Sequence, residues 1–143
     1  MTAHRAAFHS DVSALIALWA ACDLTQPHND PAKDIALAME GPNSAILLME
    51  DAGSLLGSVM VGHDGHRGWV YYVAVHPNHQ RKGLGRALMA AAETWLAERK
   101  IWKSMLMIRE TNTVVRNFYA KLGYNEEPRT VMSRAIIDPN NRP

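Results

Sequence analysis

The stretch from residue 73 to residue 86 contains the residue types and spacing best suited to hold a phosphate group. An apolar run, Val73–Val75, is followed by Pro77 and a polar loop, and then by Gly83 and Gly85 at the start of a segment with helical apolar spacing. Glycines at that place let a ligand approach the main chain, and the first turn of a helix presents unpaired N–H groups at the positive end of its dipole. Positive charge is added by Arg81, Lys82 and Arg86. The pattern therefore predicts a site for a phosphate or pyrophosphate.

The same stretch is also compatible with a tight strand-to-helix turn whose basic side chains are solvated. Two other nucleotide-binding patterns do not fit it. A P-loop needs G-x-x-x-x-G-K-[ST], which this stretch lacks, and a dinucleotide fingerprint needs a third glycine directly after a strand. The two glycines alone leave the phosphate site and the structural turn open as alternatives.

Two motifs resemble the GNAT N-acetyltransferase superfamily. The hexapeptide Gln80–Gly85 is similar to the family signature [QR]-x-x-G-x-[GA], and Val73–Pro77 matches the family's usual approach to it. Downstream, Arg109–Asn112 and Phe118–Tyr124 are similar to the block N-x-x-A-x-x-F-Y-x-K-L-G-F. The motifs stand in the family's order and spacing, and the expected elements agree over nearly the whole chain. The resemblance implies an enzyme that transfers an acetyl group from acetyl-CoA to a primary amine, without a metal.

The resemblance also implies how acetyl-CoA is bound. In this family the fourth and fifth strands of a mixed, mostly antiparallel twisted sheet splay apart, and the pantetheine arm pairs with the fourth strand. Here that role falls on the main chain of Val73, Ala74 and Val75, where one N–H would polarise the thioester carbonyl. The other implied cofactor contacts are made by Gln80, Arg81, Lys82, Gly83, Leu84, Gly85, Arg86 and Asn112.

Tyr119 falls on the position that often serves as general acid in the family. Attack of an amine on the thioester expels a thiolate, and a phenol placed at the sulfur can protonate it. The neighbours Val115, Phe118 and Leu122 are typical of a core, so a buried aromatic is the alternative. The resemblance favours the acid role, in a direct attack within a ternary complex.

The base that deprotonates the acceptor amine is not identified by the pattern. Family members that acetylate N-terminal amines of ribosomal proteins carry a Glu five residues before the matching Asn, and that position is Met107 here. This departure counts against a peptide amine as acceptor, and Glu110 is better explained as a cap of the following helix. Two rival hypotheses stay open: an N-terminal protein acetyltransferase, and a non-catalytic acyl-CoA-binding regulatory module.

Two loops and a pair of tyrosines are candidates for the acceptor site. The loop Cys22–Pro31, with Gly62–Gly68 and Tyr71-Tyr72, resembles the YpeA-type branch of the family. Candidate contacts to a cationic amine are Asp23, Asp30, Asp64 and Tyr72. The alternatives are helix capping for Asp30, turn formation for Asp64 and core packing for the tyrosines. The acceptor is expected to be a small-molecule amine or a peptide amine.

The elements that must position these residues alternate along the chain. Strands are expected at residues 3–8, 45–50, 55–63, 69–75 and 105–109, with two short ones near 124–126 and 130–136; helices are expected after Asp11, from Pro31 to Gly41, at 83–99 and at 112–122. Strand, helix and strand from Trp69 to Arg109 predict a parallel crossover beside antiparallel hairpins. We therefore expect an α/β domain with helices on both faces of the sheet over residues 1–137, followed by a flexible tail, 138–143.

Composition limits the remaining function classes. The 143 residues fit one domain, and 48% hydrophobic with 20% charged residues is ordinary for a globular chain. A net charge of +1 argues against a nucleic-acid partner. The single cysteine, Cys22, permits no intramolecular disulfide and favours a reducing compartment. With no visible secretory signal and no apolar run long enough to span a bilayer, a cytoplasmic protein without a membrane partner is expected.

Seven histidines raise the question of a metal site. His63 and His66 are three residues apart on an expected turn, and only Cys22 could supply sulfur, so no metal site is predicted. Cys22 itself is expected to act as a small apolar residue. Related proteins are often dimers, so a homodimer is possible, although no sequence feature marks an interface.

Overall fold

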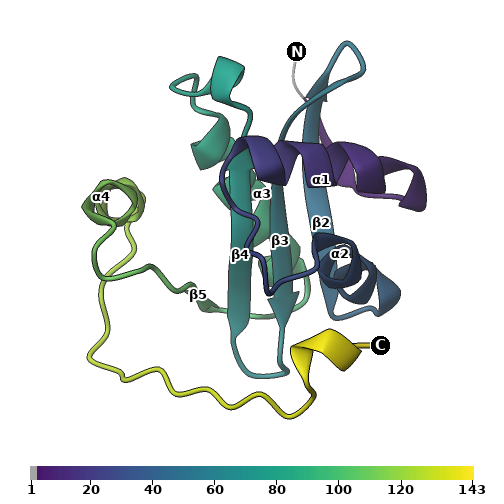
Figure 1. Cartoon of the computed structure of the whole chain (residues 1–143). Coiled ribbons are helices and arrows are strands. Elements are labelled where there is room, and N and C mark those ends of the chain that lie inside the picture. The colour runs from purple at the N-terminus through teal and green to yellow at the C-terminus, as the bar shows by residue number, and fades with distance from the viewer. Residues whose placement is uncertain (1–2) are drawn as a thin grey trace. The chain divides into compact units, whose positions relative to one another are not determined.

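The computed structural model describes residues 3–143, and its five strands form one sheet in the order β1-β2-β3-β4-β5 (Figure 1). The strands are β1 Ala3–Ala6, β2 Ser44–Asp51, β3 Ser54–His63, β4 Gly68–Val75 and β5 Ser104–Met105. Neighbours from β1 to β4 pair antiparallel, whereas β4 and β5 pair parallel. The predicted mixed, mostly antiparallel sheet is confirmed.

Helices cover both faces of this sheet, as predicted. The helices are α1 Val12–Ala21, α2 Pro31–Glu40, α3 Leu84–Glu98 and α4 Thr113–Lys121, with short 3-10 turns η1 His9–Asp11, η2 Pro77–His79 and η3 Pro139–Asn141. Helices α1 and α2 lie on one face of the sheet, and α3 lies on the other (Figure 1). In the described part of the chain, no helix has the length and apolarity needed to cross a membrane.

The α1/α2 face is built on an apolar core with one buried polar contact. Its fully or nearly fully buried side chains are Leu15, Leu18, Trp19, Ile35, Ala38, Ile46, Leu48 and Ala74. Trp19 has no exposed surface, and its indole Nε1–H donates to Oγ of the buried Ser58 at 3.1 Å. Because that hydrogen bond satisfies both groups, their burial carries no unpaired polar atom.

Two glycines let α3 pack directly on the other face. A Cβ atom at Gly68 would lie 2.5 Å from Cδ1 of Leu96, and one at Gly57 would lie 2.9 Å from Cδ1 of Leu88. Both leucines belong to α3 and are buried. The helix therefore rests against main chain at these points, and no larger residue fits without moving it.

The chain divides into two compact units, Met1–Leu106 and Met107–Pro143. The first holds the sheet and α1 to α3, and the second holds α4 and the C-terminal segment. A single domain over residues 1–137 therefore stays a prediction. Gly123, predicted to end the preceding helix, has a φ of +96°, which glycine adopts without strain.

Three predicted strands differ in the structure. The strand expected at 105–109 is reduced to β5, which pairs over two residues only. The segments near 124–126 and 130–136 form no strand within the described residues, and Val131 and Ile136 are 69% and 90% exposed. Both segments have β-forming residues, but a strand needs a neighbouring strand to accept its backbone hydrogen bonds, and none is paired with them here.

Candidate cofactor and acceptor site

One side of β4 is open along most of its length. Its other side pairs with β3 from Gly68 to Val75, whereas β5 pairs only at Gly68 and Trp69. From residue 70 to residue 75, no strand within the described chain is paired to this side. Main-chain groups of an open strand edge can take up an extended ligand as they would an added strand. The predicted positions Val73, Ala74 and Val75 all lie in this open part.

A β-bulge lies within the open part. The register between β3 and β4 shifts between Ser58 and Met60, and Tyr72 has a φ of +51°. This left-handed conformation costs a non-glycine residue roughly 1–2 kcal/mol. Contacts hold it in place: the Tyr72 ring stacks on Trp19 with centroids 4.1 Å apart, and its hydroxyl donates to Oδ2 of Asp34 at 2.9 Å. The bulge therefore changes the direction of the main chain directly before Val73.

The loop after β4 leads into an uncapped helix start. The side-chain Nε2 of Gln80 donates to the Val75 carbonyl at 3.3 Å and ties the loop back to the strand. Arg81 and Gly83 have φ values of +64° and +77°, and Gly83 is the N-cap of α3 without a side-chain hydrogen bond. In the described chain, the N–H groups of residues 84–86 have no hydrogen-bond partner. The loop thus presents several unpaired donors in one place.

The electrostatics around this helix start favour an anion. The side chains of Arg81, Lys82 and Arg86 are exposed around it. A Cβ atom at Gly83 would meet no atom within 4 Å, so the space in front of its main chain is open. Basic side chains, the helix dipole and free amides all attract negative charge. The geometry therefore fits the phosphate site predicted from the glycines better than a closed structural turn.

Two predicted site residues belong to the second unit. Oδ1 of Asn112 accepts from the Val115 N–H at 3.2 Å, which makes Asn112 the N-cap of α4. Tyr119 is 9% exposed and packs edge-to-face on Phe118 and Tyr124, with centroids 4.9 and 5.7 Å away. Burial raises the pKa of Tyr119 to about 12. Its phenol therefore keeps its proton at neutral pH, as a proton donor must.

Two candidate acceptor carboxylates accept hydrogen bonds from main-chain N–H groups of neighbouring residues. Asp30 accepts from the N–H groups of Ala32 and Lys33 and so caps α2. Asp64 accepts from the N–H groups of Arg67 and His66 at 2.7 and 2.9 Å. These hydrogen bonds lower the pKa of Asp64. The structure thus supplies the capping and turn contacts that the sequence left as alternatives.

The other two candidates lie beside the open strand and the end of α1. Asp23 follows α1, is exposed, and has a φ of +56°. Tyr72 belongs to β4 and contacts Asp34, a residue of α2 that sequence reasoning did not single out. The contact joins residues 38 positions apart, so no local pattern announces it. In the sequence, Asp34 is only an acidic residue in the first turn of a predicted helix, which is a weak signal for a contact with Tyr72.

Cys22 connects the candidate acceptor loop to the open strand. Its thiol donates to the Val75 carbonyl at 3.2 Å, and burial raises the pKa of the thiol. This contact fixes the end of α1, and the loop that follows it, against the last residue of β4. The acceptor loop predicted from the sequence thus starts at the open part of the strand.

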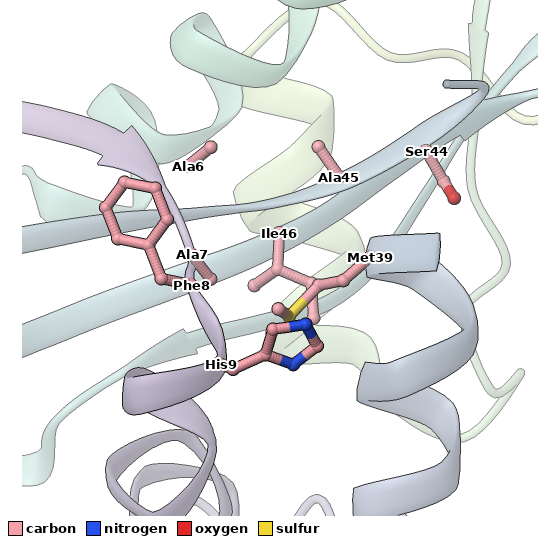
Figure 2. Close-up of a pocket in the computed structure, with 8 residues that line it drawn as sticks. All are labelled: Ala6, Ala7, Phe8, His9, Met39, Ser44, Ala45 and Ile46. Carbon is pink, nitrogen blue, oxygen red and sulfur yellow. The ribbon is translucent and has the colours of Figure 1, made fainter. Parts of the chain in front are cut away.

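A separate shallow pocket of about 340 Å³ lies between β1, α2 and the start of β2 (Figure 2). It is lined by Ala6, Ala7, Phe8, His9, Met39, Ser44, Ala45 and Ile46. None of the residues predicted to bind cofactor or acceptor belongs to this lining. Its small, largely apolar walls offer no cluster of groups suited to acyl transfer.

Comparison with known proteins agrees with this geometry. Residues 13–124 match the sequence model of the Acetyltransferase (GNAT) family. An acetyltransferase of Yersinia enterocolitica is 38% identical over 128 residues, which cover 90% of this chain and 91% of the relative.

Solved structures show the same fold at low identity. AAC(6')-Iy, in complex with the bisubstrate analog CoA-S-monomethyl-acetylneamine, has a TM-score of 0.81 at 16% identity, covering 96% of this chain and 99% of its own. A predicted acetyltransferase from Clostridium acetobutylicum, with acetyl-CoA, has a TM-score of 0.77 at 14% identity, covering 94% and 96%.

Proposed function

Because the chain belongs to the GNAT acetyltransferase family, we propose that it moves an acetyl group from acetyl-CoA to a primary amine by direct attack in a ternary complex. The observation that carries this proposal is the open part of β4, which runs into the unpaired, basic start of α3. The pantetheine arm of acetyl-CoA needs an open strand with which to pair, and its pyrophosphate needs unpaired donors and positive charge next to that strand. The CoA compounds in the two similar structures support the choice of donor.

In this proposal the first unit binds the donor through its main chain. Val73 to Val75 hold the pantetheine arm, and one of their N–H groups polarises the thioester carbonyl as negative charge develops on its oxygen. Amides of residues 81–86 surround the pyrophosphate, with Gln80 holding the loop against β4. Main-chain donors are fixed by the fold, so they need little reorganisation during the reaction.

Tyr119 and Asn112 complete the proposed machinery from α4. As the amine attacks the carbonyl carbon, the carbon–sulfur bond breaks and the sulfur needs a proton. An ordinary thiol has a pKa of about 8.5. A phenol with a pKa of about 12 holds its proton more tightly than a thiol does, so it acts first as a hydrogen-bond donor to the sulfur as charge develops there. The nitrogen releases one proton as the amide forms, and the sulfur takes up one; when the phenol passes its proton to the sulfur, the proton released from the nitrogen restores the phenol, so the step balances. Asn112 caps the first turn of α4, and the family resemblance assigns it a hydrogen bond to the cofactor.

The test follows thiol release from acetyl-CoA in the presence of a set of primary amines. We expect Tyr119→Phe to lower turnover by at least about tenfold, because a general acid contributes roughly 10²–10⁴-fold, while acetyl-CoA still binds. Tyr124→Phe removes a hydroxyl from a ring that packs on Tyr119 and serves as the matched control. It should leave turnover within about twofold of wild type, because the variant keeps the ring against Tyr119 and the Tyr124 hydroxyl has no role in the proposed reaction.

Two outcomes would contradict the proposal. Unchanged turnover in Tyr119→Phe, with a verified amine, removes Tyr119 as the proton donor. Acetyl-CoA binding without acceleration by any amine supports a non-catalytic acyl-CoA-binding module instead. Acetylation of peptides at their N-terminal amine in preference to small amines would shift the acceptor class to proteins.

A further inference from the structure

We propose that α1 positions the open part of β4 for acetyl-CoA, and that Cys22, at the end of this helix, is the positioning residue through which it acts. The inference rests on the proposed function, because it concerns how that same cofactor site is held in shape. It is carried by the hydrogen bond from the Cys22 thiol to the Val75 carbonyl, on the side of β4 where no strand of the described chain is paired.

The Val75 carbonyl faces the open side of β4. The N–H of His76 belongs to the same peptide group and donates to the Leu56 carbonyl of β3 at 2.8 Å. Because the N–H and the C=O of a trans peptide group point in opposite directions, the Val75 carbonyl points away from β3. In a complete sheet, an N–H of the next strand would donate to such a carbonyl. Here the donors are side chains.

Two side chains reach this carbonyl from different elements. The Cys22 thiol donates from the end of α1 at 3.2 Å, and Nε2 of Gln80 donates from the loop before α3 at 3.3 Å. A carbonyl oxygen has two lone pairs, so these two donors fill its acceptor capacity. The last peptide group of β4 is therefore held by β3 on one side and by two side chains on the other.

Cys22 is itself held in place. Its N–H donates to the carbonyls of Leu18 and Trp19 at 3.1 and 3.2 Å, which closes the last turn of α1, and its side chain packs against the core. The Gln80 side chain, in contrast, is exposed. A long exposed side chain loses more conformational entropy when it is fixed than a short one packed against a core. Of the two donors, Cys22 therefore makes the more rigid contact.

Helix α1 lies across this face of the sheet and contacts β4 at two points (Figure 1). Trp19 stacks on Tyr72, and Cys22, about one helical turn later, donates to Val75. The two contacts bracket the stretch proposed to hold the pantetheine arm. Hydrogen bonds weaken steeply when their angle is poor, so main-chain groups that pair with a ligand must point in fixed directions. Where a neighbouring strand would normally fix them, α1 takes over that role.

The test measures acetyl-CoA affinity by calorimetry in three variants that separate the donor from the side-chain volume. Cys22→Val fills the space of the thiol but cannot donate, Cys22→Ala removes both features, and Cys22→Ser keeps a donor in a smaller side chain. We expect the Kd to rise about fivefold in Cys22→Val and Cys22→Ala, equivalent to about 1 kcal/mol, the size of one hydrogen bond. In Cys22→Ser it should stay within about twofold of wild type, because a hydroxyl is a better donor than a thiol.

Urea denaturation gives the readout for a purely structural role. Loss of packed apolar volume lowers the free energy of unfolding, so stability should fall in Cys22→Ala and Cys22→Ser and stay closer to wild type in Cys22→Val. Affinity and stability should therefore rank the variants differently. Ala20→Ser, at an exposed position of the same helix, is the control and should leave acetyl-CoA affinity unchanged. If Cys22→Ala does not fold, Cys22→Val still tests the hydrogen bond.

Four outcomes would count against the account. Wild-type affinity in both Cys22→Val and Cys22→Ala would overturn the role of Cys22 but not the cofactor site. Weaker binding in Cys22→Ala and Cys22→Ser, but not in Cys22→Val, would show that Cys22 only fills space. Tighter binding in Cys22→Val and Cys22→Ala would show that the thiol competes with the cofactor for the Val75 carbonyl. Absence of acetyl-CoA binding to the wild-type protein would overturn the proposed function itself.

Discussion

The two sides of the sheet are built in opposite ways. On the β1 side, four residues of β1 and eight of β2 find cross-strand partners, and Arg5 joins β1 to Asp11 and Glu50 through side-chain hydrogen bonds. On the β5 side, pairing stops after Trp69. The closed side contributes its main-chain groups to the fold. The open side leaves them for a ligand, and its conformation depends on side chains such as Tyr72 and Trp19 instead.

This difference separates two kinds of substitution. Changes at the end of β4 that pairs with β5 should chiefly alter stability, whereas changes at its open part and the loop that follows should chiefly alter binding. Gly68 and Gly83 allow a direct comparison. Gly68 lies at the end of β4 that pairs with β5 and is packed against Leu96, whereas Gly83 lies in the loop before α3 with open space in front of it.

The largest effect is expected from Gly68→Val. A Cβ there would lie 2.5 Å from Leu96 Cδ1 and 3.0 Å from its Cγ, and Leu96 is buried, so its whole isobutyl group would have to move within a packed core. Overpacking of this kind lowers the free energy of unfolding by about 3 kcal/mol. Urea denaturation measures it, with Gly41→Val as control because a Cβ at Gly41 meets nothing within 4 Å. Equal stability of both variants would show that α3 does not rest on the closed end of β4.

Gly83→Val should act chiefly on cofactor binding. A side chain in front of the loop amides blocks the pyrophosphate, so we expect acetyl-CoA affinity to fall about tenfold or more, equivalent to about 1.4 kcal/mol. Gly53→Val is the matched control, because Gly53 has a nearly equal φ of +80° and equally open space in a hairpin turn. Both variants should lose similar stability from backbone strain. Equal acetyl-CoA affinity in the two by calorimetry would remove the loop from the site.

A smaller effect is expected from Tyr119→Phe in α4, on the free energy of unfolding at alkaline pH. The pKa of Tyr119 is raised from 10.0 to about 12 by burial, so the folded state holds this proton more tightly than the unfolded state. The stability linked to Tyr119 is therefore fully present below about pH 10 and is lost as the pH rises through about 12. Tyr119→Phe should flatten that part of the pH–stability curve. A curve parallel to wild type would show that Tyr119 is exposed in solution.

The smallest effect is expected at β1, whose four residues all pair with β2. Arg5 hydrogen bonds, with help from the Phe8 N–H, lower the pKa of Asp11 from 3.8 to about 2. This contribution is present above about pH 4 and is lost as the pH falls through about 2. Asp11→Asn should therefore weaken the loss of stability in acid while acetyl-CoA affinity at neutral pH stays at the wild-type value. A change in that affinity would mean that the two sides of the sheet are coupled.

The features of the open side that are local in sequence were predictable. The apolar period of α3, the glycines before it and the proline after β4 each act within a few residues, and the structure shows the helix start where they place it. The core-like neighbours of Tyr119 had made a buried aromatic the alternative to the acid role, and the structure shows a side chain that is 9% exposed. The role of each residue in catalysis remains a prediction, since residue types alone do not show what a ligand touches.

The features that depend on partners far along the chain were not predictable. Thr130–Ile136 has residues typical of a strand, but the sequence does not say which strand, if any, lies beside it. The left-handed φ of Tyr72 is unusual for a tyrosine and follows from contacts with Trp19 and Asp34, made by two separate helices. For the same reason the hydrogen bond between Tyr72 and Asp34 could not be predicted from local spacing.

The most direct measurement is isothermal titration of the purified protein with acetyl-CoA, with desulfo-CoA and ATP as comparisons. If the open part of β4 and the start of α3 form one cofactor site, acetyl-CoA and desulfo-CoA should bind with one-to-one stoichiometry. ATP, which has phosphates but no pantetheine arm, should bind much more weakly. Equal binding of ATP would reduce the site to an anion-binding loop, and absence of acetyl-CoA binding would make the glycine loop a structural turn and contradict the acetyltransferase assignment.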